Sequence, residues 1–175
     1  MVSSEVTGGA YRSTWDDVGM AARPRPYYVD VPLRWSDMDA LGHVNNVQFL
    51  RLLEEARVIA FAQWFSGVET GPDGRPPLLI ARAEVEYLRQ LHWRKEPIVV
   101  AVWVSQLAGA SFDTSYEVRS SREDDADVYA VGETTQVVFD METQRPVRIA
   151  DEHRPLLQAH AGPPVQMRRR PKGRA

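Results

Sequence analysis

The sequence predicts an α+β fold in which one long helix packs against an antiparallel β-sheet of about five strands. The stretch Asn46–Phe65 contains no glycine or proline, and its apolar residues recur at helical spacings. After residue 77 the chain shows four strand-like runs joined by short connections. Consecutive strands with short links pair antiparallel, because a parallel pair needs a long crossover.

The length of 175 residues fits one domain, and an apolar content of 43% is typical of a globular chain. The two ends differ in composition from the middle. Residues 1–26 carry early serines and glycines and predict a loosely ordered extension, and residues 158–175 predict a flexible basic tail. The folded unit is therefore expected over residues 27–157.

The first strand is expected over Tyr27–Trp35, with an edge position or a bulge at Pro32, because proline has no amide hydrogen to donate. A polar loop over residues 36–46 leads into the helix. Within the helix, Arg51 and Glu55 are spaced for an i,i+4 ion pair. Apolar residues occupy more than one stripe, which predicts that other structure encloses most of this helix.

The runs after the helix have strand patterns. Apolar and charged residues alternate in Ala83–Tyr87 and again in Phe112–Arg119, whereas Ile98–Ser105 is a nearly continuous apolar run and Tyr129–Phe139 forms the last long strand. A single sheet has two open edges unless other structure covers them, and open edges favour pairing with a second copy. A homodimer is therefore expected.

Charge and composition exclude several classes of protein. Residues 168–175 hold five of the 21 basic residues and no acid, so residues 1–167 carry a formal charge of −8. An acidic body argues against nucleic-acid binding. The longest apolar run is too short for a membrane span, and the absence of cysteine excludes disulfides and cysteine-ligated metals. A cytoplasmic location is expected.

Most enzyme signatures are missing, including a nucleophile elbow, a phosphate loop and a paired-histidine metal motif. The polar loop before the helix is the exception, because six chemistry-bearing residues lie within ten positions: Asp37, Asp39, Gly42, His43, Asn45 and Asn46. Local turns and a helix cap use the same residues. Alternatively, a carboxylate beside a helix N-terminus can attack a carbonyl whose oxygen the helix amides stabilise. Composition alone leaves both interpretations open.

The stretch Asp-Met-Asp-Ala-Leu-Gly-His-Val-Asn-Asn over residues 37–46, followed by Leu53-Glu54-Glu55-Ala56-Arg57, resembles the acyl-CoA thioesterases of the hotdog superfamily, in the 4-hydroxybenzoyl-CoA thioesterase-like branch. Glu86-Tyr87-Leu88-Arg89 and Asp140–Val147 resemble the same family in kind and order. The resemblance covers about residues 27–157. It implies a central helix wrapped by the sheet, in a homodimer or homotetramer with active sites at the subunit interface.

The resemblance also implies roles for individual residues. Asp39 matches the catalytic carboxylate, as nucleophile or general base, and Gly42 matches the glycine of the motif and is expected to contact the substrate. The amide near Asn46 would hold the thioester oxygen, and His43 and Asn45 would orient water or substrate. Ser111 resembles a position near bound CoA in some relatives. No metal or redox cofactor is implied, since CoA arrives with the substrate.

Several residues have simpler interpretations. Arg89 carries a charge that suits CoA phosphates, but surface arginines are common. Asp37 is expected to face solvent or to bond its own loop, and His92 is expected on the surface. Buried aromatic residues such as Trp64 and Trp103 are expected in the core before any acyl channel.

Two other functions remain open. One is a hydratase or dehydratase that acts on acyl thioesters on the same scaffold. The other is a non-catalytic protein that binds acyl-CoA. The acidic body also favours free acyl-CoA over a substrate carried by an acidic carrier protein.

Overall fold

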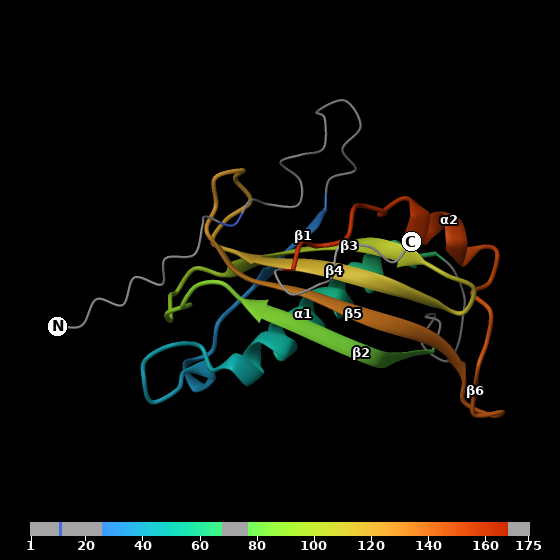
Figure 1. Ribbon diagram of the computed structural model, residues 1–175, viewed down its shortest axis with the longest axis horizontal. Helices are drawn as coiled ribbons and strands as arrows, with labels where there is room; N and C mark the ends of the chain where they lie inside the picture. The colour runs from blue at the N-terminus through green and yellow to red at the C-terminus, as the bar shows by residue number, and fades with distance from the viewer. Residues whose placement is uncertain (1–10, 12–25, 68–76, 168–175) are drawn as a thin grey trace.

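A computed structural model describes residue 11 and residues 26–67 and 77–167 (Figure 1). Its centre is an antiparallel sheet in the order β1-β3-β4-β5-β2, with a short β6 paired to β5. The strands are β1 (Tyr27–Val31), β2 (Leu78–Tyr87), β3 (Ile98–Leu107), β4 (Ser111–Arg119), β5 (Val128–Asp140) and β6 (Arg145–Pro146). The predicted α+β class is confirmed.

Helix α1 (Asn46–Trp64) packs against one face of the sheet (Figure 1). One side of it is buried against the core strands through Phe49, Leu52, Leu53, Ala56, Ala60, Phe61 and Trp64. The predicted ion pair is present, with 2.7 Å between Arg51 Nη1 and Glu55 Oε1. The opposite side is apolar but exposed, at Val47, Leu50, Val58 and Ile59. Within one chain the helix is therefore enclosed on one side only, and not on most sides as expected.

Strand β1 ends at Val31, four residues before the predicted end. Pro32 follows immediately and cannot donate a ladder hydrogen bond, so pairing with β3 stops there. The chain then makes a short 3₁₀ turn over Trp35–Asp37 before it reaches α1.

The expected pairing of consecutive strands holds for β3–β4 and β4–β5 but is wrong for β2 and β3. These two strands lie on opposite sides of the sheet centre, since β2 pairs only with β5 and β3 pairs with β1 and β4 among the described strands. Residues 88–97 therefore cross the end of the sheet instead of making a hairpin. This crossing connection supplies one wall of the pocket described below.

The chain stays packed beyond residue 157, where the folded unit was expected to end. Helix α2 (His153–Gln158) follows β6, and Ala161 then pairs parallel to Val104 of β3. Val165 and Met167 are buried on the outer face of the sheet beside Trp103. Residues 158–167 thus cover this face, because it presents apolar side chains such as Trp103 that would otherwise lie in water.

Some expectations fall outside the described residues. These are the N-terminal extension apart from Tyr11 and Pro26, the turn-rich loop before Pro77, and the basic residues 168–175. Among the described residues, no helix is long and apolar enough to cross a membrane.

Candidate active site

The polar loop before α1 folds back on itself as a tight turn. Met38 and Val44 pair as an isolated antiparallel bridge, and the Asp39 amide donates to the His43 carbonyl at 2.8 Å. Gly42 has a φ of 78°, in the left-handed region that side chains disfavour. Glycine at this position therefore allows the turn to close, and the expectation that Gly42 also contacts the substrate stays a prediction.

The turn fixes the Asp39 carboxylate. Its Oδ1 atom accepts hydrogen bonds from the Leu41 amide at 2.8 Å and from the His43 amide at 3.1 Å. The bond from the His43 amide is the largest cause that lowers the pKa of Asp39 below its ordinary 3.8, and the Leu41 amide adds to it. The carboxylate is therefore ionised at neutral pH, as a nucleophile or a general base must be.

Helix α1 begins directly after the turn. Asn45 is its N-cap, and its side chain accepts from the Val47 amide at 3.1 Å. Asn46 is the first helical residue, so its amide has no acceptor within the helix. The Asn46 carbonyl accepts from the Tyr87 hydroxyl at 3.0 Å, which ties the helix start to the end of β2. An amide with a partial positive charge therefore lies at the entrance to the site.

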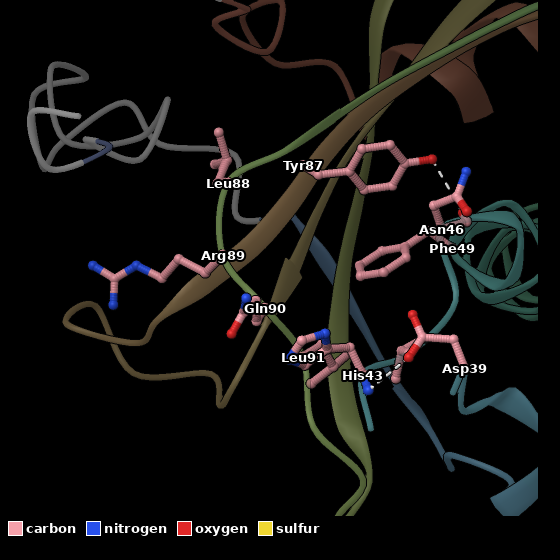
Figure 2. A pocket seen from close by; sticks show the side chains of 10 residues that line it. Asp39, His43, Asn46, Phe49, Tyr87, Leu88, Arg89, Gln90 and Leu91 are labelled. Atoms are coloured by element: carbon pink, nitrogen blue, oxygen red, sulfur yellow. Dashed lines mark hydrogen bonds between the residues drawn. The ribbon is translucent and has the colours of Figure 1, made fainter. Parts of the chain in front are cut away.

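These groups surround a pocket of about 380 Å³ (Figure 2). Two segments form it: the turn with the start of α1, and the end of β2 with the crossing connection. The lining residues are Asp39, His43, Val44, Asn46, Phe49, Tyr87, Leu88, Arg89, Gln90 and Leu91. A backbone hydrogen bond of 2.7 Å from the Val44 amide to the Leu91 carbonyl joins the two segments. In Figure 2 the Asp39 oxygen that makes no drawn bond turns towards Phe49.

The other predicted site residues occupy different places. Arg89 lines the pocket, about half exposed, and forms an ion pair with Asp127. Ser111 begins β4 and lies outside the pocket lining of its own chain. Asp37 is buried and bonds its own loop at the Arg34 amide, as expected, and also Arg51 of α1 at 2.6 Å. Trp64 and Trp103 are buried in the two apolar cores, also as expected.

Sequence reasoning missed the apolar and aromatic wall of the pocket. Phe49 and Tyr87 pack edge to face, with ring centroids 5.2 Å apart, beside Asp39 and Asn46. The alternating pattern of β2 placed Tyr87 correctly on a strand, but it did not indicate that the strand ends at the start of α1. Only the register of β2 against β5 sets that position.

The described residues offer no cluster of three or more His, Asp or Glu side chains that could hold a metal ion. Asp39 and His43 are close, but the hydrogen bond between them uses the His43 backbone amide. The sequence-based prediction that the protein needs no metal or redox cofactor stays a prediction.

Comparison with known families gives the geometry its context. Residues 33–159, which include the turn, α1 and all strands after it, match the model of the thioesterase-like superfamily. The chain belongs to this superfamily. It is a thioester hydrolase with the hotdog fold, as its sequence motif predicted. No curated protein matches the sequence.

Several solved structures share the architecture of this chain. A thioesterase from Thermus thermophilus, solved with coenzyme A and zinc, is 28% identical, with a TM-score of 0.65 over 79% of this chain and 96% of the other. A predicted thioesterase from Bacillus stearothermophilus is 25% identical, with a TM-score of 0.67 over 79% and 98%. A 1,4-dihydroxy-2-naphthoyl-CoA thioesterase from Synechocystis, at 18% identity and a TM-score of 0.62 over 77% and 95%, shares the fold.

Proposed function

We propose that this thioester hydrolase acts on acyl-CoA, releasing a free carboxylic acid and CoA, and that Asp39 is its catalytic carboxylate. The observation that carries the proposal is the position of Asp39: an ionised carboxylate, held by two backbone amides, lines the pocket at the N-terminus of α1. The CoA-bound relative from Thermus thermophilus supports CoA as the thiol part of the substrate.

The proposed chemistry uses two groups of the pocket, the Asn46 amide and the Asp39 carboxylate. The thioester oxygen lies at the Asn46 amide, which stabilises the negative charge that develops when the carbonyl is attacked. Asp39 either attacks the carbonyl carbon and forms an anhydride that water then hydrolyses, or removes a proton from the attacking water. In both routes the C–S bond breaks, CoA leaves as the thiol, and one water is consumed. His43 and Asn45 orient the water and the helix start.

A hydratase would need two side chains that act together as acid and base, and Asp39 does not form such a pair with the His43 imidazole. Its contact with His43 is made through the backbone amide, so the imidazole is not held as a partner for the carboxylate. The acyl group would extend along Phe49 and Leu91, which provide an apolar wall. Arg89, which lines the pocket and is about half exposed, would contact the CoA phosphates.

We further propose that the active protein is a homodimer or homotetramer with its sites at the subunit interface. The support is a set of exposed apolar side chains on these two elements, here called the α1–β2 surface: Val47, Leu50, Val58 and Ile59 on α1, and Leu79, Ile80 and Tyr87 on β2. Strand β2 pairs only with β5 among the described strands, so its outer edge has backbone groups that a second copy can pair with. Tyr87 belongs to both this surface and the pocket. Ser111 would reach a substrate only within such an assembly.

The test is thiol release from a panel of short, long and aromatic acyl-CoAs, measured with a thiol-reactive dye. The protein has no cysteine and contributes no background. We expect wild type to hydrolyse at least one member and Asp39→Asn to lose at least about a hundredfold in kcat. A mutant as fast as wild type would exclude Asp39. No release by wild type from any member would favour a carrier-bound substrate, a hydratase or an acyl-CoA-binding protein.

Asp140→Asn is the matched control. The Asp140 carboxylate also accepts two backbone amides, from Glu142 at 2.8 Å and from Thr143 at 3.0 Å, and its pKa is also lowered, chiefly by these bonds. It is the last residue of β5, where the β5–β6 turn begins, and it does not line the pocket. Asp140→Asn makes the same chemical change outside the site, and we expect its kcat to equal that of wild type.

A further inference from the structure

His92, which the sequence placed on the surface, contacts the turn that holds Asp39. It lies on the crossing connection and forms an isolated antiparallel bridge with His43. The two imidazole rings meet edge to face, with centroids 4.8 Å apart. The His92 Nδ1 atom lies 3.2 Å from the Gly42 carbonyl oxygen. A carbonyl oxygen only accepts hydrogen bonds, so Nδ1 carries the hydrogen and donates.

The position of this bond gives it a link to Asp39. The Gly42 carbonyl and the His43 amide belong to the same peptide group, which is planar. One end of this group accepts from His92, and the other end donates to Asp39 Oδ1 at 3.1 Å. Fixing the direction of the carbonyl therefore fixes the direction of the amide. Hydrogen bonds in such a chain also polarise one another, which strengthens the bond to the carboxylate.

Gly42 makes this peptide group easy to reorient. Gly42 has a φ of 78°, and because glycine has no Cβ, its backbone tolerates either direction of the following peptide. If the peptide group rotated, the His43 amide would leave Asp39 and the carboxylate would lose one of its two anchors. A donor on the carbonyl side opposes that rotation.

We propose that His92 is a positioning residue of the active site: its Nδ1–H bond to the Gly42 carbonyl orients the Gly42–His43 peptide so that the His43 amide holds the Asp39 carboxylate. The proposal rests on the proposed role of Asp39. His92 does not line the pocket, so it acts through the peptide group and not on the substrate.

Three substitutions of His92 test its hydrogen-bond donor and its aromatic ring separately. His92→Phe keeps a ring against His43 without the donor, His92→Asn keeps a donor near the Nδ1 position without the ring, and His92→Ala removes both. We expect kcat to fall about tenfold to a hundredfold in His92→Phe and His92→Ala, with KM within about twofold of wild type, because a misplaced catalytic group costs that much. His92→Asn should recover most of kcat.

Outcomes that would overturn the proposal are a wild-type kcat in His92→Phe, or a His92→Asn variant as slow as His92→Phe. A rise in KM with unchanged kcat would also overturn it, since that result would place His92 in substrate binding. His160→Asn serves as the control. It replaces a half-buried histidine that stacks on Trp64, near the other end of α1, and should leave both constants unchanged.

A second measurement does not depend on activity. Titration of the Asp39 carboxyl carbon by ¹³C NMR reports how firmly the two amides hold the carboxylate. We expect its pKa to move up towards the ordinary 3.8 in His92→Phe and to stay lowered in His92→Asn. An unchanged pKa in His92→Phe would overturn the proposal. If Asp39→Asn and wild type were equally active, the proposed function would fail, whereas this titration would still decide whether His92 orients the turn.

Discussion

Asp37 and Asp39 lie two residues apart and have different environments. Asp37 is 2% exposed, and its Oδ2 accepts from the Arg34 amide at 2.7 Å and from Arg51 at 2.6 Å. It therefore fastens the loop to α1. Asp39 is bonded through Oδ1 to the amides of its own turn and lines the pocket. The two residues have the same chemical type, so their environments explain why Asp37 has a structural role and Asp39 the proposed catalytic one.

The lowered pKa of Asp39 predicts how stability depends on pH. The folded protein binds this proton more weakly than the unfolded chain does, so the ionised carboxylate stabilises the fold above pH 3.8. This stabilisation is lost as the pH falls through the lower pKa of the folded state. The Tm difference between wild type and Asp39→Asn should be largest near neutral pH and approach zero at a pH below both pKa values, as measured by circular dichroism.

Asp140 has the same kind of turn, so Asp140→Asn should show the same pH dependence of its Tm difference without a change in kcat. The pair thus separates the charge contribution to stability from the contribution to catalysis. A Tm difference for Asp39→Asn that stays constant from neutral pH down to the acid limit would contradict the assigned environment of its carboxylate.

At the residue scale, the sequence located the turn and the start of the helix, because both depend on local chemistry: a glycine at a positive φ and an Asn cap. It could not separate Asn45 from Asn46 as the cap, since either residue type serves. The partners of the turn, such as Leu91 and His92, come from a segment far along the chain. No local pattern indicates a contact set by strand pairing.

Among the secondary-structure elements, the close approach of α1 to β5 depends on Gly132. A Cβ built there would lie 2.8 Å from Leu53 Cδ1 and 3.2 Å from the Glu84 carbonyl oxygen. Leu53 is buried, and the Glu84 oxygen belongs to the paired strand, so neither can move away easily. The missing side chain therefore leaves room for the Leu53 side chain of α1 to pack directly on β5.

Gly132→Ala should lower the free energy of unfolding by about 1–3 kcal/mol, because it overpacks this contact. Gly109→Ala is the matched control, because nothing lies within 4 Å of the Cβ position there, and it should change stability by less than about 0.5 kcal/mol. Urea unfolding measures both. Equal effects at the two glycines would show that α1 does not need this close approach.

The sequence predicted the elements whose patterns are strong and missed those that tertiary contacts impose. Periodicity placed α1 and most of β3, β4 and β5, and their ends agree within a few residues. Helix α2 has six residues, one of them Pro155, which is too short for a periodic pattern. The crossing of residues 88–97 was missed because chain order alone does not reveal which strands are neighbours.

Considering the whole molecule, its C-terminal segment completes the outer face of the sheet. The Trp103 indole donates to the Pro163 carbonyl at 2.7 Å, and the Val165 amide donates to Ser115 Oγ at 3.3 Å. Trp103 is only 1% exposed as a result. The outer face is thus covered by the chain itself, and the α1–β2 surface stays available for a second copy.

Deleting residues 162–175 should expose Trp103, shift its fluorescence to longer wavelength and lower the free energy of unfolding by roughly 2–5 kcal/mol, through the lost burial of Val165 and Met167. Deleting only residues 168–175 should change neither the fluorescence nor the assembly seen by size-exclusion chromatography. The same loss of stability in both truncations would show that the basic residues, and not the apolar cover, stabilise this face.

Ile80→Lys and Leu50→Glu place charges on the α1–β2 surface and should shift the protein towards monomer in light scattering, with loss of activity if the sites need two subunits. Met141→Lys is the control, since Met141 is 60% exposed in the β5–β6 turn and is not one of the residues of that surface. Wild-type assembly in Ile80→Lys and Leu50→Glu would locate the subunit contact elsewhere.

The crossing of residues 88–97 also sets when the site can form during refolding. Strand β1 must find β3, and β2 must find β5, before Leu91 can meet Val44. Such pairings join segments distant in sequence and are slow to form, because loop closure costs entropy before the contacts reward it. The helix can appear early without a pocket beside it. Recovery of hydrolysis after denaturation will therefore lag behind recovery of the helical circular-dichroism signal. The rate at which activity returns then measures the last step of folding.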